Sequence, residues 1–191
     1  IYWGYKSDGQ FQSWEEIANW PINNDGHGNT TLRPGDIKYQ DINGDGVIND
    51  LDKRPIGYST SGDFNPILSY GLNFSASWKG FDVSMDFTGS ALSSYFPNYE
   101  NKLPFHDGGN SPQYMMDDSW HLADIWDANS ELIPGKYPMF LLGNSSHSNY
   151  WDSDFWVKKV RYIKLKNFEI GYNLPRTWLE KAWMQSCRVY V

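Results

Sequence analysis

The chain has 191 residues, enough for one or two ordinary domains, and its 23 acidic and 16 basic side chains give a formal net charge of -7. This charge argues against nucleic acid as a partner, because phosphate binding needs clustered Lys and Arg. The single cysteine excludes a disulfide within the chain, and no stretch approaches the roughly 18 continuous apolar residues of a membrane helix. Aromatic residues make up 17% of the chain, which suits interfaces and surfaces that face sugars or a membrane boundary.

The chain opens with a predicted strand over residues 1–11, and a polar excursion rich in Asn, Asp, Gly and Pro follows over residues 12–66. Ser13, with Glu16 three positions later, has the spacing of a capping box and predicts a short helical turn. The first predicted strand starts at the first residue, and the last one reaches the final residue. We therefore expect the chain to be a fragment of a longer protein.

Residues 41–52 of this excursion have the spacing of a calcium-binding loop. Oxygen-bearing residues recur at alternate positions, and Gly46 stands sixth, where such a loop turns sharply. The twelfth residue is Asp rather than the usual Glu, and nearby prolines replace long flanking helices, which argues against an EF-hand sensor. Calcium would therefore be structural here, and a metal-free turn is the alternative. The predicted ligands are Asp41, Asn43, Asp45, the backbone carbonyl of Val47, Asn49 and Asp52.

The clearest periodicity of the sequence predicts a β-hairpin. Apolar residues alternate with polar or small ones from Leu68 to Trp78 and again from Phe81 to Phe87. Lys79-Gly80 between them suits a tight reversal. The predicted strands of the hairpin cover residues 67–79 and 81–93.

A second long excursion is predicted over residues 94–154, with further strands over residues 155–174 and 188–191. The connections between strands thus run long, short, long, short, which places both excursions at one end of an antiparallel sheet. An outer-membrane barrel has this asymmetry, with long extracellular loops, short periplasmic turns and strands of ~10 residues. The predicted fold class is all-β, an antiparallel transmembrane β-barrel segment whose extracellular loops are the two excursions.

A soluble protein is the alternative, in which the same alternation packs on the core of a β-sandwich. Such a chain would be an extracellular carbohydrate-binding module with a structural calcium loop. Loops longer than ~15 residues are uncommon in compact domains, which favours the barrel. The positions of Leu72, Phe74 and Val83 separate the two: they face lipid in a barrel and lie under a second sheet in a sandwich.

Several motifs along nearly the whole chain resemble the C-terminal part of SusC/RagA-type TonB-dependent outer-membrane transporters. Both the order and the spacing of these motifs agree with those of the family. The motifs are Pro34-Gly35-Asp36-Ile37-Lys38-Tyr39 running into the loop at Asp41, Ile56-Gly57, Tyr70-Gly71, Lys79-Gly80-Phe81-Asp82, the stretch from Tyr162 to Pro175, and Arg188-Val189-Tyr190-Val191.

The resemblance implies a large plugged 22-stranded barrel in the bacterial outer membrane. It implies import of glycan or peptide nutrients with a SusD-like surface lipoprotein, driven by the TonB energy-coupling complex. The partners it implies are therefore this lipoprotein, TonB, an oligosaccharide or peptide substrate and outer-membrane lipid. The plug and the TonB-contacting segment belong to the family's N-terminal part, and nothing in this chain matches them.

No catalytic set emerges from the sequence, so we expect no enzyme. The four histidines stand apart without zinc-site spacing, and no serine lies in a GxSxG elbow. Aromatic residues of the excursions are candidates to stack on a sugar or contact a partner, and packing between loops is the alternative. These candidate contact residues are Trp14, Trp20, Tyr99, Trp120, Trp126 and Trp151.

Overall fold

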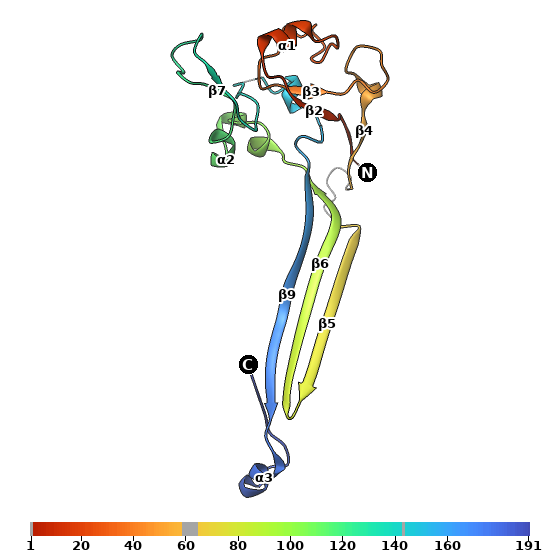
Figure 1. The fold of residues 1–191 in the computed structure, drawn as a ribbon, viewed down its shortest axis with the longest axis vertical. Helices are drawn as coiled ribbons and strands as arrows, with labels where there is room; N and C mark the ends of the chain where they lie inside the picture. The colour runs from red at the N-terminus through yellow and green to blue at the C-terminus, as the bar shows by residue number, and fades with distance from the viewer. Residues whose placement is uncertain (1, 59–64, 143) are drawn as a thin grey trace. The chain divides into compact units, whose positions relative to one another are not determined.

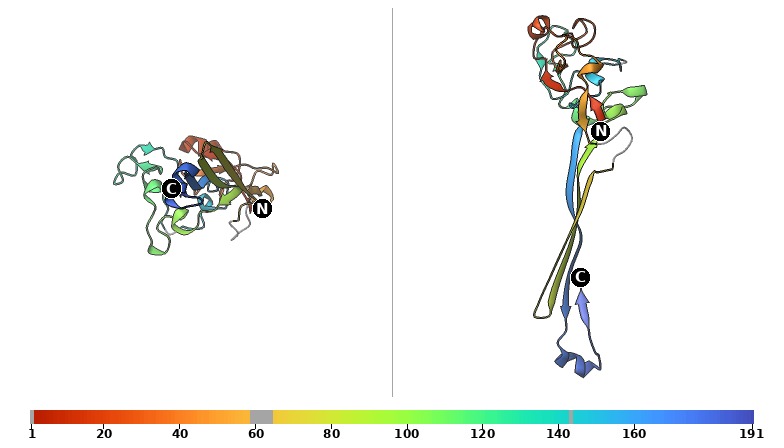
Figure 2. Two further views of the ribbon diagram at one scale, coloured as in Figure 1. Left: turned by 90° about the horizontal axis from the view of Figure 1, so that it is seen from below. Right: turned by 90° about the vertical axis from the view of Figure 1, so that its right-hand side faces the viewer.

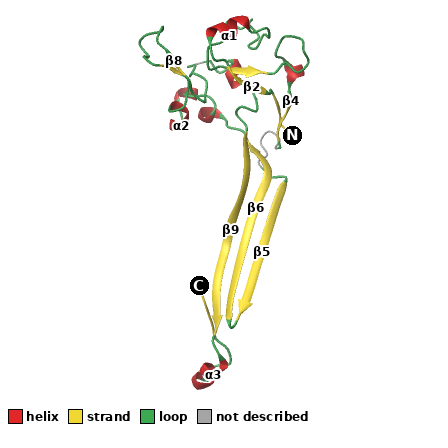
Figure 3. Cartoon of the chain, in the orientation of Figure 1, coloured by secondary structure: helices red, strands yellow, loops and turns green. Residues whose placement is uncertain are grey.

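The structure, a computed structural model, describes residues 2–58, 65–142 and 144–191. Residue 1 of the first predicted strand, and residues 59–64 and 143 of the predicted excursions, lie outside the described residues. The chain divides into a sheet unit, residues 64–93 and 159–191, and a loop unit, residues 1–63 and 94–158. The long strands fall in the sheet unit, and most short strands and most helices fall in the loop unit (Figure 1, Figure 3).

The sheet unit contains one four-stranded sheet in the order β10-β9-β6-β5. Its hairpin pairs Leu68 with Ala91 and Trp78 with Phe81 in an unbroken antiparallel register. The turn residues Lys79 and Gly80 both have positive φ, 48° and 90°, as a two-residue type I′ turn requires. The fold is thus mainly β, as predicted. The strands are β5 (Leu68–Trp78), β6 (Phe81–Tyr95), β9 (Lys158–Asn173) and β10 (Arg188–Tyr190).

One face of the β5–β6 hairpin is apolar and uncovered. Leu72 lies opposite Phe87, and Phe74 lies opposite Met85. The side chain of Leu72 is 60% exposed and that of Phe74 is 51% exposed. Among the described residues, neither buried core cluster includes a residue of this sheet. Seen nearly edge-on, the long strands form a single twisted layer (Figure 2).

The opposite face of the sheet is polar and carries hydrogen bonds between strands. Asp86 on β6 accepts hydrogen bonds from Asn73 on β5 and, at 2.9 Å, from Asn167 on β9. Asp82, also on β6, pairs with Arg188 on β10. The four strands are therefore tied together on this face by side chains as well as by the backbone.

The two excursions fold together in the loop unit around three two-stranded ribbons, β1–β4, β2–β3 and β7–β8. Within the described residues 2–11, two separate strands take the place of the single predicted strand, which corrects that prediction. The chain is interrupted at Tyr5, whose N–H donates to the carbonyl of Asp152 at 2.8 Å and whose carbonyl accepts from the N–H of Asp154 at 3.1 Å. The short strands are β1 (Tyr2–Gly4), β2 (Ser7–Gln10), β3 (Ile37–Tyr39), β4 (Arg54–Gly57), β7 (His121–Leu122) and β8 (Leu132–Ile133).

The helices are short, and the first begins where the capping pattern predicts. The Ser13 hydroxyl accepts from the N–H of Glu16 at 3.1 Å, and the Glu16 carboxylate accepts from the N–H of Gln12 at 2.6 Å. No helix among the described residues has the length and apolar character needed to cross a membrane. The helices are α1 (Trp14–Asn19), α2 (Gln113–Met116) and α3 (Arg176–Leu179), with 3₁₀ turns at Asp50–Asp52, Tyr99–Asn101, His106–Gly108, Ser148–Tyr150 and Glu180–Ala182.

The predicted strand over residues 155–174 starts later, at Lys158, because Trp156 belongs to the core of the loop unit. The Trp156 ring stacks on Tyr137 at 6.1 Å, and its indole N–H donates to the carbonyl of Asn149 at 2.7 Å. The core draws on both excursions. Its buried residues are Tyr5, Ile37, Tyr39, Ile48, Met115, Tyr137 and Trp156.

Two fully buried side-chain amides bind the backbone of β3 where a neighbouring strand would otherwise do so. Asn149, from the second excursion, accepts from the N–H of Ile37 at 3.0 Å and donates to the Asp36 carboxylate at 2.7 Å. Asn24 donates to the carbonyl of Ile37 at 2.9 Å and accepts from the N–H of Tyr39 at 2.7 Å. Buried backbone groups need such partners, so both amides fix β3, and that of Asn149 also joins the two excursions.

Replacing Asn149 by Ala should loosen β3. The substitution leaves the Ile37 N–H and an Asp36 oxygen buried without partners, at a cost of about 2–4 kcal/mol. Native-state hydrogen exchange on the full-length protein should show lower protection at Ile37 and Tyr39. The exposed Asn101, replaced by Ala, is the matched control, and unchanged protection in the Asn149 variant would contradict the role assigned to its amide.

The turn around Asp25 should depend on pH. Burial alone would raise the pKa of Asp25, but hydrogen bonds from the Thr31 hydroxyl and the backbone N–H groups of His27, Asn29 and Thr31 lower it overall. A lowered pKa in the folded state stabilises the ionised form, so this contribution is complete above the unfolded value of about 3.9 and is lost as the pH falls through the folded pKa. Exchange protection of residues 27–31, corrected for intrinsic rates, should therefore drop below about pH 4.

Replacing Asp25 by Asn is the control for this pH dependence. The variant should already have low protection at neutral pH and a flatter pH profile at these amides. If the variant and the parent protein lose protection over the same pH range, another group is responsible.

Candidate functional site

The predicted calcium loop is wound around the side chain of Asp41. One carboxylate oxygen of Asp41 accepts from the N–H of Gly44 and the other from the N–H of Gly46, both at 2.7 Å. The two glycines have φ of 77° and 82°, a conformation that costs a glycine little and other residues more. The turn predicted at Gly46 is thus observed.

The middle of the loop is held by Asp45 and two asparagines. The Asp45 carboxylate accepts from the side-chain amides of Asn43 at 2.8 Å and Asn49 at 2.9 Å, and from the N–H of Val47 at 2.9 Å. These hydrogen bonds lower the pKa of Asp45, and the one from the Asn43 amide has the largest effect. The carboxylate is therefore ionised at neutral pH. Both amides direct donors toward Asp45, and their oxygens accept from backbone N–H groups within the loop.

Asp52 closes the loop from its far end. Its side chain is fully buried, and its two oxygens accept from the N–H groups of Ile42 at 2.8 Å and Asn49 at 2.9 Å. The loop is attached to the core through Ile48, which is 4% exposed and whose N–H donates to the carbonyl of Asn23 at 3.0 Å. The loop therefore has a defined shape through its own hydrogen bonds.

The loop contains the types of ligand that calcium prefers, because carboxylate, amide and backbone oxygens are its usual ligands. As the loop is folded here, the described residues contain no group of three His, Cys, Asp or Glu side chains close enough to hold a metal ion. Binding would therefore require the carboxylates of the loop to move together, and the amides of Asn43 and Asn49, which donate to Asp45, to turn their oxygens toward the ion. Each carboxylate oxygen has two acceptor positions, so the backbone hydrogen bonds of Asp41 and Asp52 leave capacity for an ion.

Three of the six candidate contact aromatics are exposed on the loop unit. Trp14 is 60% exposed at the start of α1, Tyr99 is 65% exposed with its edge against His106, and Trp126 is 89% exposed between β7 and β8. An Asx turn fixes the last of these, since the N–H of Trp126 donates to the Asp124 carboxylate at 2.9 Å. These rings are available to a ligand or a partner protein.

The other three candidate aromatics pack the loops. Trp20 lies edge-on to Phe11 at 5.5 Å, and Trp151 stacks on Tyr39 at 5.7 Å. Trp120 is 4% exposed, and its ring covers Gly35 so closely that any side chain there would overlap it. For these three residues, packing between loops accounts for the aromatic side chain.

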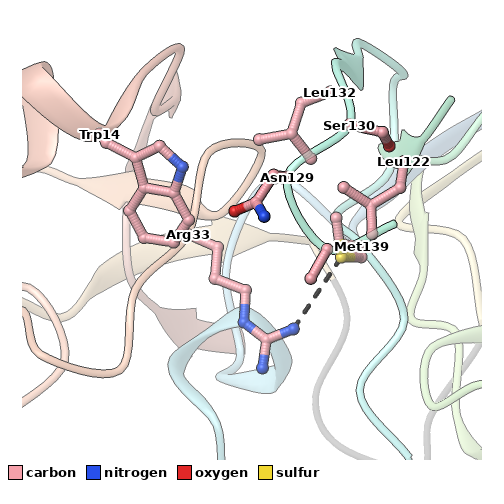
Figure 4. A pocket seen from close by; sticks show the side chains of 8 residues that line it. Trp14, Arg33, Leu122, Asn129, Ser130, Leu132 and Met139 are labelled. Atoms are coloured by element: carbon pink, nitrogen blue, oxygen red, sulfur yellow. Dashed lines mark hydrogen bonds between the residues drawn. The ribbon is translucent and has the colours of Figure 1, made fainter. Parts of the chain in front are cut away.

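The loop unit also contains a pocket that the sequence did not predict, with a volume of about 590 Å³ (Figure 4). One wall comes from the first excursion, and the other comes from the β7–β8 ribbon and the segment after it. No local sequence pattern marks this pocket, because its walls lie far apart in the chain. Its lining residues are Trp14, Arg33, Leu122, Ala128, Asn129, Ser130, Leu132 and Met139.

No family model matches the sequence, but two curated proteins of Formosa agariphila do. One, named TonB-dependent receptor P3, is 26% identical over 194 aligned residues that cover 100% of this chain. The other, TonB-dependent receptor P26, is 24% identical over 159 residues that cover 82% of this chain. This chain spans only 16% and 14% of the lengths of these relatives, which are named as receptors.

Among solved structures, the chain resembles one from the RagAB peptide importer in its open-open state, with a TM-score of 0.50 and 15% identity. The match covers 99% of this chain and 18% of that one. At this identity the likeness concerns the fold. Relatives in sequence and a neighbour in fold therefore confirm the resemblance of this chain to the SusC/RagA-type TonB-dependent transporters.

Proposed function

We propose that this chain is the C-terminal barrel segment of a TonB-dependent importer in the bacterial outer membrane. The observation that carries the proposal is the two-faced sheet, with Leu72 and Phe74 exposed on its apolar face. In a barrel, the apolar face of this sheet would point toward lipid and the polar face toward the barrel interior. The named relatives support this assignment.

The sandwich alternative fits the sheet less well. It requires a second sheet over Leu72 and Phe74, whereas both are half exposed or more and the long strands form a single layer (Figure 2). In a multi-pass barrel, strands outside this chain would pair with the free edges of β5 and β10 and close the structure. The family resemblance gives 22 strands for the whole barrel.

The proposed cargo is a glycan or peptide nutrient, and the proposed partner is a SusD-like surface lipoprotein. The name of the RagAB structure supports a peptide as the first candidate. The exposed rings of Tyr99 and Trp126 are the candidate contacts for the lipoprotein or the cargo, because aromatic side chains concentrate binding energy at interfaces. TonB would supply energy through segments outside this chain.

A charge on the apolar face should interfere with membrane assembly. Replacing Leu72 by Arg places a guanidinium toward lipid near the middle of β5, at a cost of about 2–4 kcal/mol if it lies near the bilayer midplane. We expect less folded full-length protein in the outer-membrane fraction, measured by fractionation and by heat-dependent electrophoretic mobility.

Ser75 to Arg is the matched control, because Ser75 lies on the polar face of the same strand. That variant should assemble at nearly the parental level. Recovery of the parent protein as a soluble species, or equal assembly of the two Arg variants, would refute the barrel proposal.

We propose separately that the loop at residues 41–52 takes up Ca²⁺ with a structural role. Support comes from the spacing of Asp41, Asp45 and Asp52 and from the turn at Gly46. Ion binding to the folded loop would stabilise it by mass action, so chelation with EGTA should lower exchange protection at residues 41–52 and added Ca²⁺ should restore it.

The amides of β3 serve as the internal control for chelation, because they are held by Asn24 and Asn149 and should keep their protection. Unchanged protection at residues 41–52, together with no bound ion in elemental analysis, would establish the metal-free turn instead.

A further inference from the structure

We propose that the pocket between Trp14 and the β7–β8 ribbon binds the C-terminal residue of a short peptide, with the terminal carboxylate at Arg33 and an apolar side chain against the opposite wall. The pocket lies wholly within the loop unit. The proposal therefore goes beyond the import function and does not depend on membrane insertion or transport.

The first support is an unpaired positive charge. In the part of the chain that the structure describes, the Arg33 guanidinium donates a hydrogen bond of 3.9 Å to the sulfur of Met139 (Figure 4), and sulfur is a weak acceptor. Among the described residues, no carboxylate forms an ion pair with this guanidinium. The nearby Asp36 attracts Arg33 electrostatically but forms no ion pair with it, since its oxygens accept from Asn149 and from the backbone N–H of Arg33. A guanidinium offers paired donors that match a carboxylate.

The second support is the chemistry of the walls. The Trp14 ring lies on one side of the guanidinium, and Leu122 and Leu132 lie on the other (Figure 4). The volume of about 590 Å³ falls inside the range of roughly 300–1,000 Å³ that is usual for small-ligand sites. A charge beside apolar walls fits a ligand that joins a carboxylate to an apolar group.

The third support is that the backbone fixes the pocket without a ligand. The N–H of Arg33 donates to the buried Asp36 carboxylate at 2.7 Å. In the ribbon, the N–H of Asn129 donates to Asp127 at 2.9 Å, and the Ser130 hydroxyl donates to the carbonyl of Asp124 at 3.0 Å. Little ordering of the chain would therefore oppose binding.

The same walls disfavour an acidic sugar, the other common source of a carboxylate. A sugar ring would stack on Trp14, but of the described lining residues opposite only Asn129 offers its hydroxyl groups a free side-chain amide, since the Ser130 hydroxyl is bonded to Asp124. The apolar Leu122, Leu132 and Met139 offer them no strong partner. The side-chain amide of Asn129 is the polar group best placed among the lining residues to bind the peptide bond of a terminal residue.

The test is calorimetric titration of the purified full-length receptor in detergent at low salt with the tripeptide Gly-Gly-Leu, its C-terminal amide, and glucuronate. The free acid should bind about tenfold or more tightly than the amide, because a hydrogen bond to a charged group contributes that much. Glucuronate should bind more weakly than the tripeptide.

Replacing Arg33 by Gln should abolish the preference for the acid over the amide, and Arg33 to Lys should retain part of it. Trp14 to Ala should weaken both peptides equally. Lys181 to Gln removes the same charge from an exposed position in the sheet unit and should change nothing. Exchange protection at Ile37 verifies that each variant is folded.

Equal binding of acid and amide by the parent receptor, including no binding of either, would overturn the proposal. So would an acid preference that survives in the Arg33 to Gln variant. Tighter binding of glucuronate than of the tripeptide would overturn the apolar part of the assignment. None of these results bears on membrane location, so fractionation tests the import proposal independently.

Discussion

The loop unit depends on the hydrogen bonds that Asn149 makes across the two excursions. Long connections with little regular structure can be ordered only if their buried backbone groups find partners. Asn149 binds Asp36 and Ile37 of the first excursion and accepts the indole N–H of Trp156 on its own carbonyl. One residue thus joins both segments, and the aromatic core closes around it. Removing the amide should therefore weaken the attachment of the two excursions to each other, although the Tyr39 hydroxyl and the core residues still join them.

The sheet unit is held together differently, because its strands form backbone hydrogen bonds with one another while its apolar side chains lack a buried core. β5 and β6 pair along their full common register, yet Leu72 and Phe74 remain exposed. Apolar side chains in that pattern need another medium or another protein surface to cover them. In the proposed barrel this medium is lipid, so one chain would have a part built for water and a part built for a membrane.

Sequence reasoning succeeded where the controlling interactions are local. The alternation from Leu68 to Trp78 and the turn at Lys79-Gly80 depend on neighbours in the chain, and the hairpin follows them. It failed at residues 1–11, where Tyr5 pairs with Asp152 and Asp154 at the far end of the second excursion. It also failed at Trp156, which is drawn into the core of the loop unit by Tyr137 and Asn149. The same limit applies to the pocket, since Arg33 and the β7–β8 ribbon meet only after both excursions have folded.

The hydrogen bond between Asn149 and Asp36 also affects the chemistry of the pocket. Asp36 is the acid closest in sequence to Arg33, and in an exposed loop it would neutralise the guanidinium. Here its two oxygens are occupied by Asn149 and by the backbone of Arg33. The interaction that orders the loop unit thus keeps Asp36 from a direct ion pair with Arg33, although the two charges attract, and fixes the backbone from which the Arg33 side chain extends. A rigid frame that carries a guanidinium without a direct ion pair is better suited to capturing an anionic ligand than a flexible loop would be, because less order has to be created on binding.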